Sequence, residues 1–178
     1  MALSSLIKTM EDGGVITLYD GTGTPITLTV RYDKADFKIA GLKHGLREST
    51  PYQSRGKLRS VRKAKVIFPT LAFTAMITDL SETGTGTLMD WVAKTAGTPF
   101  TSRVKTMSIG DVDTCHVKWT QEGTDLGDGA DQSLRAKDVE LSIEVSEADP
   151  NIFSLSGIIY GDIDDGASTP VVYFTAPR

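Results

Sequence analysis

The residues best suited to chemistry in this chain are one cysteine and two histidines, and their arrangement does not build a catalytic site. Cys115 and His116 are neighbours in a segment where apolar and polar residues alternate, as in a β-strand. Adjacent strand residues point to opposite faces of a sheet, so the two side chains cannot form a thiolate–imidazolium pair. His44 is remote in the sequence, which leaves too few ligands for a zinc site with Cys115. We therefore expect Cys115 to be a small buried residue and the protein not to be an enzyme.

Two other patterns could bind ions, and both fall short. Asp125, Asp128 and Asp131 resemble a calcium loop in composition, but their spacing does not match one, and a solvated acidic turn is the simpler interpretation. The glycine-rich segments 21–23 and 84–86 lack the lysine and the spacing of a phosphate-binding loop. We expect neither a metal nor a cofactor.

The charged residues show a pattern of a different kind, because basic and acidic residues are concentrated in two separate segments. Residues 41–65 are expected to form a long loop, and loops of that length are uncommon unless they have a function. Residues 122–133 form a second expected loop, rich in glycine and aspartate. The basic residues of the first are Lys43, Arg47, Arg55, Lys57, Arg59, Arg62, Lys63 and Lys65, and the acidic residues of the second are Glu122, Asp125, Asp128 and Asp131.

Three interpretations of the basic segment compete. It could be a solvated surface loop without a partner. It could contact nucleic acid, although Tyr52 is the only aromatic residue nearby and no stacking platform is evident. It could also be an arm that docks on an acidic surface of a neighbouring copy, with the charged residues of both segments at the subunit interface. We favour the third interpretation.

Strand-like alternation dominates the rest of the chain. In residues 139–145 the odd positions are apolar, so Glu140 and Glu144 are expected on the outward face. Pro69 interrupts another alternating stretch and must lie at a bulge or an edge. The further strands predicted in this way cover residues 15–19, 26–32, 36–40, 66–68, 71–77, 103–109, 114–120, 152–160 and 171–174.

One segment has the periodicity of a helix. Leu88, Trp91 and Val92 fall on one face of a helix that a threonine caps and that ends before Gly97. We expect this short helix to pack on a sheet, with Trp91 as the packing anchor.

Length and composition suit one globular domain spanning residues 1–178, with the long loop at 41–65 and an extended C-terminal tail at 162–178. The 178 residues are 39% hydrophobic and carry a net charge of −4. No apolar run is long enough to cross a bilayer, and a single cysteine suits assembly in a reducing cytoplasm. We predict a mainly β fold: an antiparallel β-sandwich or partly closed barrel with one packed α-helix and a long loop arm.

This order of parts resembles the tail tube (major tail) proteins of long-tailed bacteriophages, which share a fold with type VI secretion tube proteins. The likeness is one of layout and spans most of the chain. The residues that carry it are Gly14-Val15-Ile16-Thr17-Leu18-Tyr19-Asp20-Gly21, Leu88-Met89-Asp90-Trp91-Val92, and 139–160 with the turn Glu147-Ala148-Asp149-Pro150-Asn151.

The resemblance implies a structural role. Members of the family form hexameric rings whose sheets join edge to edge around a lumen, and the rings stack into a tube through which DNA passes. This chain would then assemble in the host cytoplasm into the tail of a virion, with copies of itself and other tail proteins as partners. Acidic side chains facing the lumen would keep DNA from binding, and Glu140 and Glu144 are candidates for that position.

Two other classes of function stay open. One is another virion or ring-forming component on a related fold, such as a tail terminator or a head decoration protein. The other is a nucleic-acid-binding β module that uses the basic segment.

Overall fold

The computed structural model of the protein describes residues 14–20, 27–30, 36–43, 47–76, 88–93, 108–109, 111–121, 132–147 and 152–176. Within these ranges the chain forms thirteen strands and one short helix. In chain order they are β1 (Gly14–Tyr19), β2 (Thr27–Val30), β3 (Lys38–Ala40), β4 (Arg47–Ser54), β5 (Lys57–Val66), β6 (Thr70–Met76), α1 (Leu88–Ala93), β7 (Ser108–Ile109), β8 (Val112–Asp113), β9 (Cys115–Gln121), β10 (Ser133–Ser146), β11 (Ile152–Ile159), β12 (Ile163–Asp164) and β13 (Val172–Phe174).

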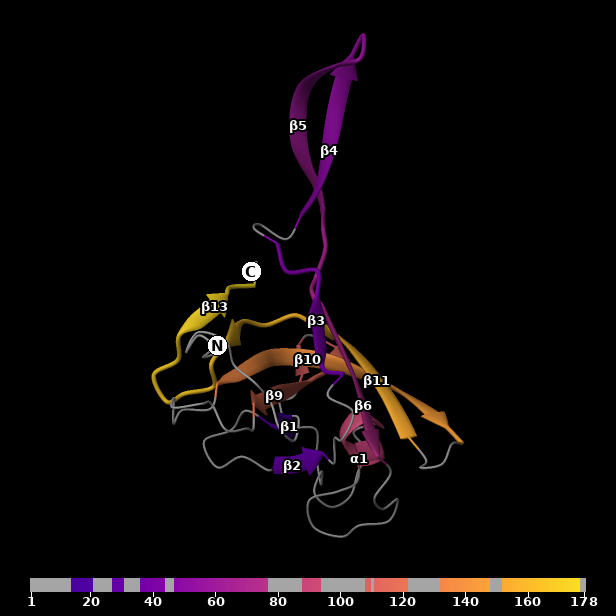
Figure 1. The fold of residues 1–178 in the computed structure, drawn as a ribbon, viewed down its shortest axis with the longest axis vertical. Coiled ribbons are helices and arrows are strands. Elements are labelled where there is room, and N and C mark those ends of the chain that lie inside the picture. Colours follow the sequence, from indigo (N-terminus) through magenta and orange to yellow (C-terminus); the bar gives the residue numbers. More distant parts are fainter. Residues whose placement is uncertain are drawn as a thin grey trace, which may run out of the picture.

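Nine of these strands form one antiparallel sheet that curls into a half-barrel. Its main path runs in the order β2-β1-β9-β10-β11-β6-β3, and β12 and β13 continue beside the first half of β10 (Figure 1). The predictions of a mainly β fold and of antiparallel pairing are confirmed. The described strands do not form two stacked sheets, so of the two predicted forms the partly closed barrel is found and the sandwich is not. The core lies on the concave side of the single curled sheet.

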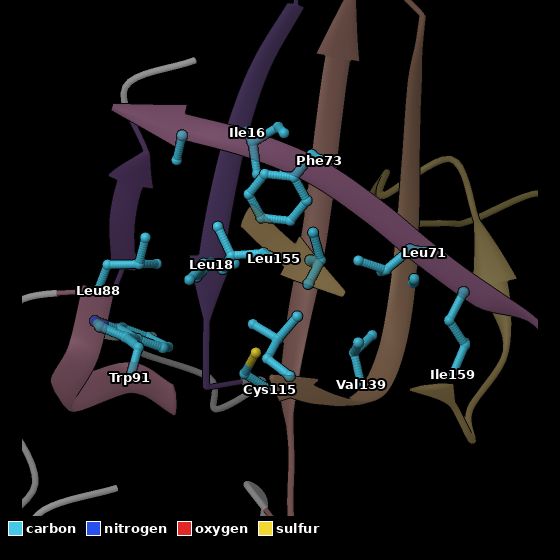
Figure 2. Close-up of a cluster of buried hydrophobic side chains, with 14 of the residues drawn as sticks. Ile16, Leu18, Leu71, Phe73, Leu88, Trp91, Cys115, Val139, Leu155 and Ile159 are labelled. Carbon is cyan, nitrogen blue, oxygen red and sulfur yellow. The ribbon is translucent and has the colours of Figure 1, made fainter. Parts of the chain in front are cut away.

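The core forms because alternate residues of each strand point into the concave side of the sheet. Ile16 and Leu18 of β1 and Val117 of β9 are completely buried there. Across the sheet they continue into the inward residues of β10, β11 and β6, among them Val139 and Leu155 (Figure 2). The period-two pattern of the sequence therefore located these core strands correctly.

β10 contains a bulge, and the strand pairs with different neighbours before and after it. Before it, Arg135 and Ala136 pair with β12, and after it Val139 begins the pairing with β11. Asp138 takes up the extra length with a φ of 50°, in the left-handed region. Gly161 passes close by, and a Cβ there would lie 2.7 Å from the carbonyl oxygen of Lys137, so only glycine fits.

The expected packed helix is reduced to the six residues of α1, which is a correction to the prediction. Leu88 and Trp91 are buried in the core, at the edge of the cluster (Figure 2). Six residues make fewer than two helical turns, too short for a covering layer on the sheet. The threonines and Gly97 that were predicted to bound the helix lie outside the described residues.

The long loop predicted for residues 41–65 is wrong, because most of that range is a β-hairpin. β4 and β5 pair antiparallel from Arg47↔Val66 to Ser54↔Lys57 and form a two-stranded sheet of their own. The hairpin projects away from the body above β3 and β6 (Figure 1). Its two strands hydrogen-bond to each other. The sequence shows no clear alternation of apolar and polar residues there, because the body buries neither face of the hairpin.

The segment predicted as an extended tail folds back onto the sheet in its described part, residues 162–176. β12 pairs with β10, and β13 pairs with β12. The amide N–H of Ala176 donates to Asp162 Oδ1 at 2.9 Å, and Ala176 is buried. The strand predicted at residues 171–174 corresponds to β13.

Candidate functional site

The β4–β5 hairpin is the most exposed element of the described chain. Every side chain from residue 47 to residue 62 is exposed, and Tyr52, Leu58 and Val61 keep 52%, 60% and 56% of their surface in solvent. The two strands are joined by a two-residue turn in which Arg55 and Gly56 have φ angles of 50° and 72°, the geometry of a type I′ turn. An isolated two-stranded hairpin is marginally stable in water, so this element gains from a partner.

The register gives the hairpin two different faces. Pro51 pairs with Val61, and Gln53 pairs with Leu58 after an irregularity in the ladder, so the apolar Pro51, Leu58 and Val61 share one face. Tyr52 lies on the other face, where the guanidinium of Arg62 stands 5.9 Å from its ring centroid. One face thus presents three apolar side chains beside the polar Gln53 and Ser49, and the other face is aromatic and cationic.

The basic side chains predicted at the subunit interface are exposed where the structure describes them. They are Lys43 beside the hairpin and Arg47, Arg55, Lys57, Arg59 and Arg62 on it. Lys63 belongs to β5, but its side chain lies outside the described set. Glu122, Asp125, Asp128 and Asp131 also lie outside the described residues, so the predicted pairing of the two segments stays a prediction.

Charge is distributed very unevenly between the hairpin and the rest of the chain. Residues 47–66 contain seven lysines and arginines and one acid, a net charge of +6. Because the whole chain carries −4, the remaining residues carry −10. The hairpin of one copy and the body of another are therefore electrostatically complementary.

Both ends of the main sheet path are open among the described strands. β2 pairs only with β1, and β3 pairs only with β6. Open edges present unpaired backbone groups that can pair with another chain. The half-barrel therefore has two edges at which a second sheet could continue it.

The convex face of the sheet carries the two acids that were predicted to point outward. Glu140 lies opposite Ile158, and Glu144 lies opposite Ser154, which in turn pairs with Thr74. Glu144 is exposed. The Tyr160 hydroxyl donates to Glu140 Oε2 at 2.7 Å, and this hydrogen bond raises the pKa of Tyr160. The outward orientation of both acids is confirmed, and their neighbours on this face are mostly small and polar.

A buried ionic cluster fastens the C-terminal segment to β10. Asp164 of β12 is completely buried, and its carboxylate accepts hydrogen bonds from Arg135 Nε at 2.6 Å and Nη2 at 2.8 Å. Lys137 Nζ lies 2.8 Å from Oδ2, and the Gly166 amide donates to Oδ1 at 2.8 Å. Burial by itself raises the pKa of Asp164, but the hydrogen bonds from Arg135, Lys137 and Gly166 outweigh it and bring the pKa to about 2. The same hydrogen bond raises the pKa of Arg135.

Cys115 and His116 point to opposite faces, as the sequence predicted. Cys115 is buried in the core, while the His116 ring lies 5.6 Å from the Tyr19 ring on the convex side. His116 Nδ1 accepts a hydrogen bond from the Asp138 amide at 3.1 Å. Burial lowers the pKa of His116, the nearby Arg135 acts in the same direction, and Asp138 opposes them. The ring is therefore neutral and structural, supporting the bulge of β10.

An apolar groove lies between β3 and β13 and was not predicted from the sequence. Its volume is about 970 Å³. Phe37 and Trp119 line it and stack with ring centroids 5.7 Å apart and planes 2° apart. The other residues that line it are Ile39, Leu42, Lys43, Leu134, Ile163, Tyr173, Phe174 and Thr175.

Within the described ranges, no group of three or more histidine, cysteine or acidic side chains is placed to hold a metal ion. The described helix is too short to span a membrane. No protein-family model, curated protein sequence or solved structure matches this chain.

Proposed function

We propose that the protein is a structural subunit that assembles with copies of itself into hexameric rings, and that the rings stack into the tail tube of a bacteriophage, a conduit for DNA. The observation that carries the proposal is the fully exposed β4–β5 hairpin projecting from an open-edged half-barrel. In the part of the chain that the structure describes, no element of the same copy supports the hairpin, and β2 and β3 each keep one unpaired edge. Self-assembly gives both a partner.

In this proposal the open edges are the contacts within a ring. The β2 edge of one copy meets the β3 edge of the next, and the half-barrels join into a continuous sheet around a lumen. The curled sheet with its projecting hairpin is then a tail-tube-like fold. Other tail proteins cap the tube, which is built in the host cytoplasm and becomes part of the virion.

The convex sheet face is the proposed wall of the lumen. Glu140 and Glu144 put negative charge on this face. Ser154 opposite Glu144, and Thr74 opposite Ser154, keep the wall around Glu144 small and polar, while Ile158 lies opposite Glu140. Such a surface repels phosphates and lets DNA pass without specific binding.

Electron microscopy of concentrated protein tests the proposal. We expect rings with sixfold symmetry and stacks of rings, and sedimentation velocity should show a mass that rises with protein concentration. A closed ring that never stacks would instead favour a tail terminator or a head decoration protein. A strict monomer at every salt and protein concentration would contradict self-assembly altogether.

Binding of nucleic acid by the hairpin is a second candidate function, favoured by its exposed guanidinium and ammonium groups. If this function is correct, a duplex should bind with an affinity that falls roughly 10³-fold or more between 50 and 200 mM salt, as about six phosphate contacts require. Replacing Arg55, Lys57, Arg59 and Arg62 by glutamine should abolish this binding. The matched control is Lys38→Gln, an exposed cation on β3. A mobility-shift titration measures both, and no shift at low salt contradicts the function.

A further inference from the structure

We infer that the β4–β5 hairpin of one copy seats its apolar face in the groove between β3 and β13 of a second copy. The inference rests on the proposed self-assembly and names the receiving site. The hairpin supplies an apolar face, and the groove supplies an apolar cleft on the same polypeptide.

The hairpin face needs a partner that excludes water. Pro51, Leu58 and Val61 lie together in the half of the hairpin nearer the turn, and Leu58 and Val61 keep more than half of their surface exposed. Their side chains have no contact with the core cluster of their own chain. Burying them against apolar groups would be favourable by the area removed from water.

The groove is built to receive apolar side chains. Its volume of about 970 Å³ is at the upper end of the roughly 300–1,000 Å³ that holds a drug-sized molecule, so several hairpin side chains fit in it together. Two of the apolar residues that line it are exposed, Leu42 at 49% and Tyr173 at 59% of their surface. Exposed apolar residues in an apolar cleft are typical of a protein–protein contact.

The hairpin cannot reach the groove of its own chain. Leu42 and Lys43, which line the groove, lead into the base of the hairpin, and the hairpin then runs away from the body (Figure 1). With eight residues in β4, the turn stands about 26 Å beyond the base at roughly 3.3 Å per residue. The hairpin of each copy therefore reaches a different molecule. Repeating this contact gives a head-to-tail arrangement, which forms rings or stacks.

Charge selects a second copy as the occupant. The hairpin carries +6 and the rest of the chain −10, so hairpin and body attract each other across two molecules. The basic residues on the opposite face of the hairpin stay outside the groove.

Disulfide trapping between two differently labelled chains tests the inference. One chain carries Val61→Cys on the apolar face of the hairpin, and the other carries Thr175→Cys at the groove; both positions are exposed, so neither change disturbs the core. Mixed under mild oxidation, they should form a mixed disulfide. The matched control is Ser60→Cys, whose side chain points to the other face of β5 and should give roughly fivefold less product. The native Cys115 is buried and can stay in place.

Each outcome bears on one claim. Equal yields of mixed disulfide from Val61→Cys and Ser60→Cys overturn the inference. A disulfide that forms within one monomer of a chain carrying both Val61→Cys and Thr175→Cys overturns it too. Rings or stacks in micrographs without any mixed disulfide overturn the inference and leave the proposed function standing. Protection of Thr175→Cys from a thiol reagent without a mixed disulfide shows a different occupant and also overturns it. Absence of any self-association removes the proposed function itself.

Discussion

Replacing Asp164 by asparagine is expected to lower the free energy of unfolding by about 3–5 kcal/mol, the range found when one partner of a buried ion pair is removed. The carboxylate is completely buried and holds Arg135 at 2.6 and 2.8 Å and Lys137 at 2.8 Å. An asparagine leaves two basic groups without a countercharge and places an amide N–H₂ where acceptors are needed. Such a loss is a large part of the roughly 5–15 kcal/mol that stabilises a domain.

Thermal and denaturant unfolding followed by circular dichroism measure the effect. The melting temperature should fall by roughly 6–20 °C for a chain of this size. Asp165→Asn is the matched control, because Asp165 Oδ1 accepts from the amides of Ala167 and Val171 and asparagine keeps that acceptor. We expect the control to lose less than about 1 kcal/mol. Equal losses in the two variants would contradict the role given to the buried cluster.

The pH dependence gives an independent check on the same cluster. The pKa of Asp164 is about 2 in the folded protein and about 3.9 in an unfolded chain, so its contribution is complete above pH 4 and is lost as the pH falls toward 2. Asp164→Asn does not titrate there. The difference in the free energy of unfolding between the natural protein and Asp164→Asn should therefore be about 1 kcal/mol smaller at pH 3 than at pH 7. An unchanged difference at pH 3 would show that Asp164 does not titrate as the structure requires.

Strands with one buried face could be predicted from the sequence, and strands without one could not. β1, β9, β10, β11 and β6 alternate because one face meets the core, and the period-two pattern found each of them. β4 and β5 have both faces in solvent, so their sequence shows no clear period of two. The segment was therefore predicted as a loop. The one local signal was Arg55-Gly56, a glycine in the second position of a two-residue turn.

Tertiary features were beyond the reach of the sequence for a different reason. Arg135 and Asp164 are 29 positions apart in the sequence. No local sequence pattern predicts that β12 pairs with β10. The bulge at Asp138 could not be predicted for the same reason, because it lies where β10 changes its partner from β12 to β11. The apolar groove is lined by residues of β3 and of β13, which are more than 130 positions apart in the chain. These contacts are set by topology rather than by local propensity.

The candidate interface was predicted in part. The basic residues from Arg47 to Arg62 are exposed together, as an interface requires, but they stand on a paired hairpin rather than a loop. Glu140 and Glu144 face outward because alternation in β10 fixes them there. The apolar face of the hairpin was missed, since Leu58 and Val61 are three positions apart and share a face only because of the irregularity between β4 and β5.

Removing the hairpin should abolish the stacking of rings while leaving the body folded, because the open sheet edges proposed as the contacts within a ring stay in place. Arg47 and Val66 are paired across the ladder, so a short Gly-Ser linker can replace residues 47–66 without moving β3 or β6. The body should keep its melting temperature within a few degrees, because the residues of the core cluster all lie outside the excised segment.

At concentrations at which the intact chain forms stacks, the largest particle measured by sedimentation should be a single ring, since the variant lacks both the apolar face and the +6 charge that the body of a second copy attracts. A chain in which Leu58 and Val61 become serine keeps the charge and loses only the apolar face. Its assembly should weaken without disappearing. Stacks of rings from the hairpin-less protein would contradict the view that this element joins one ring to the next.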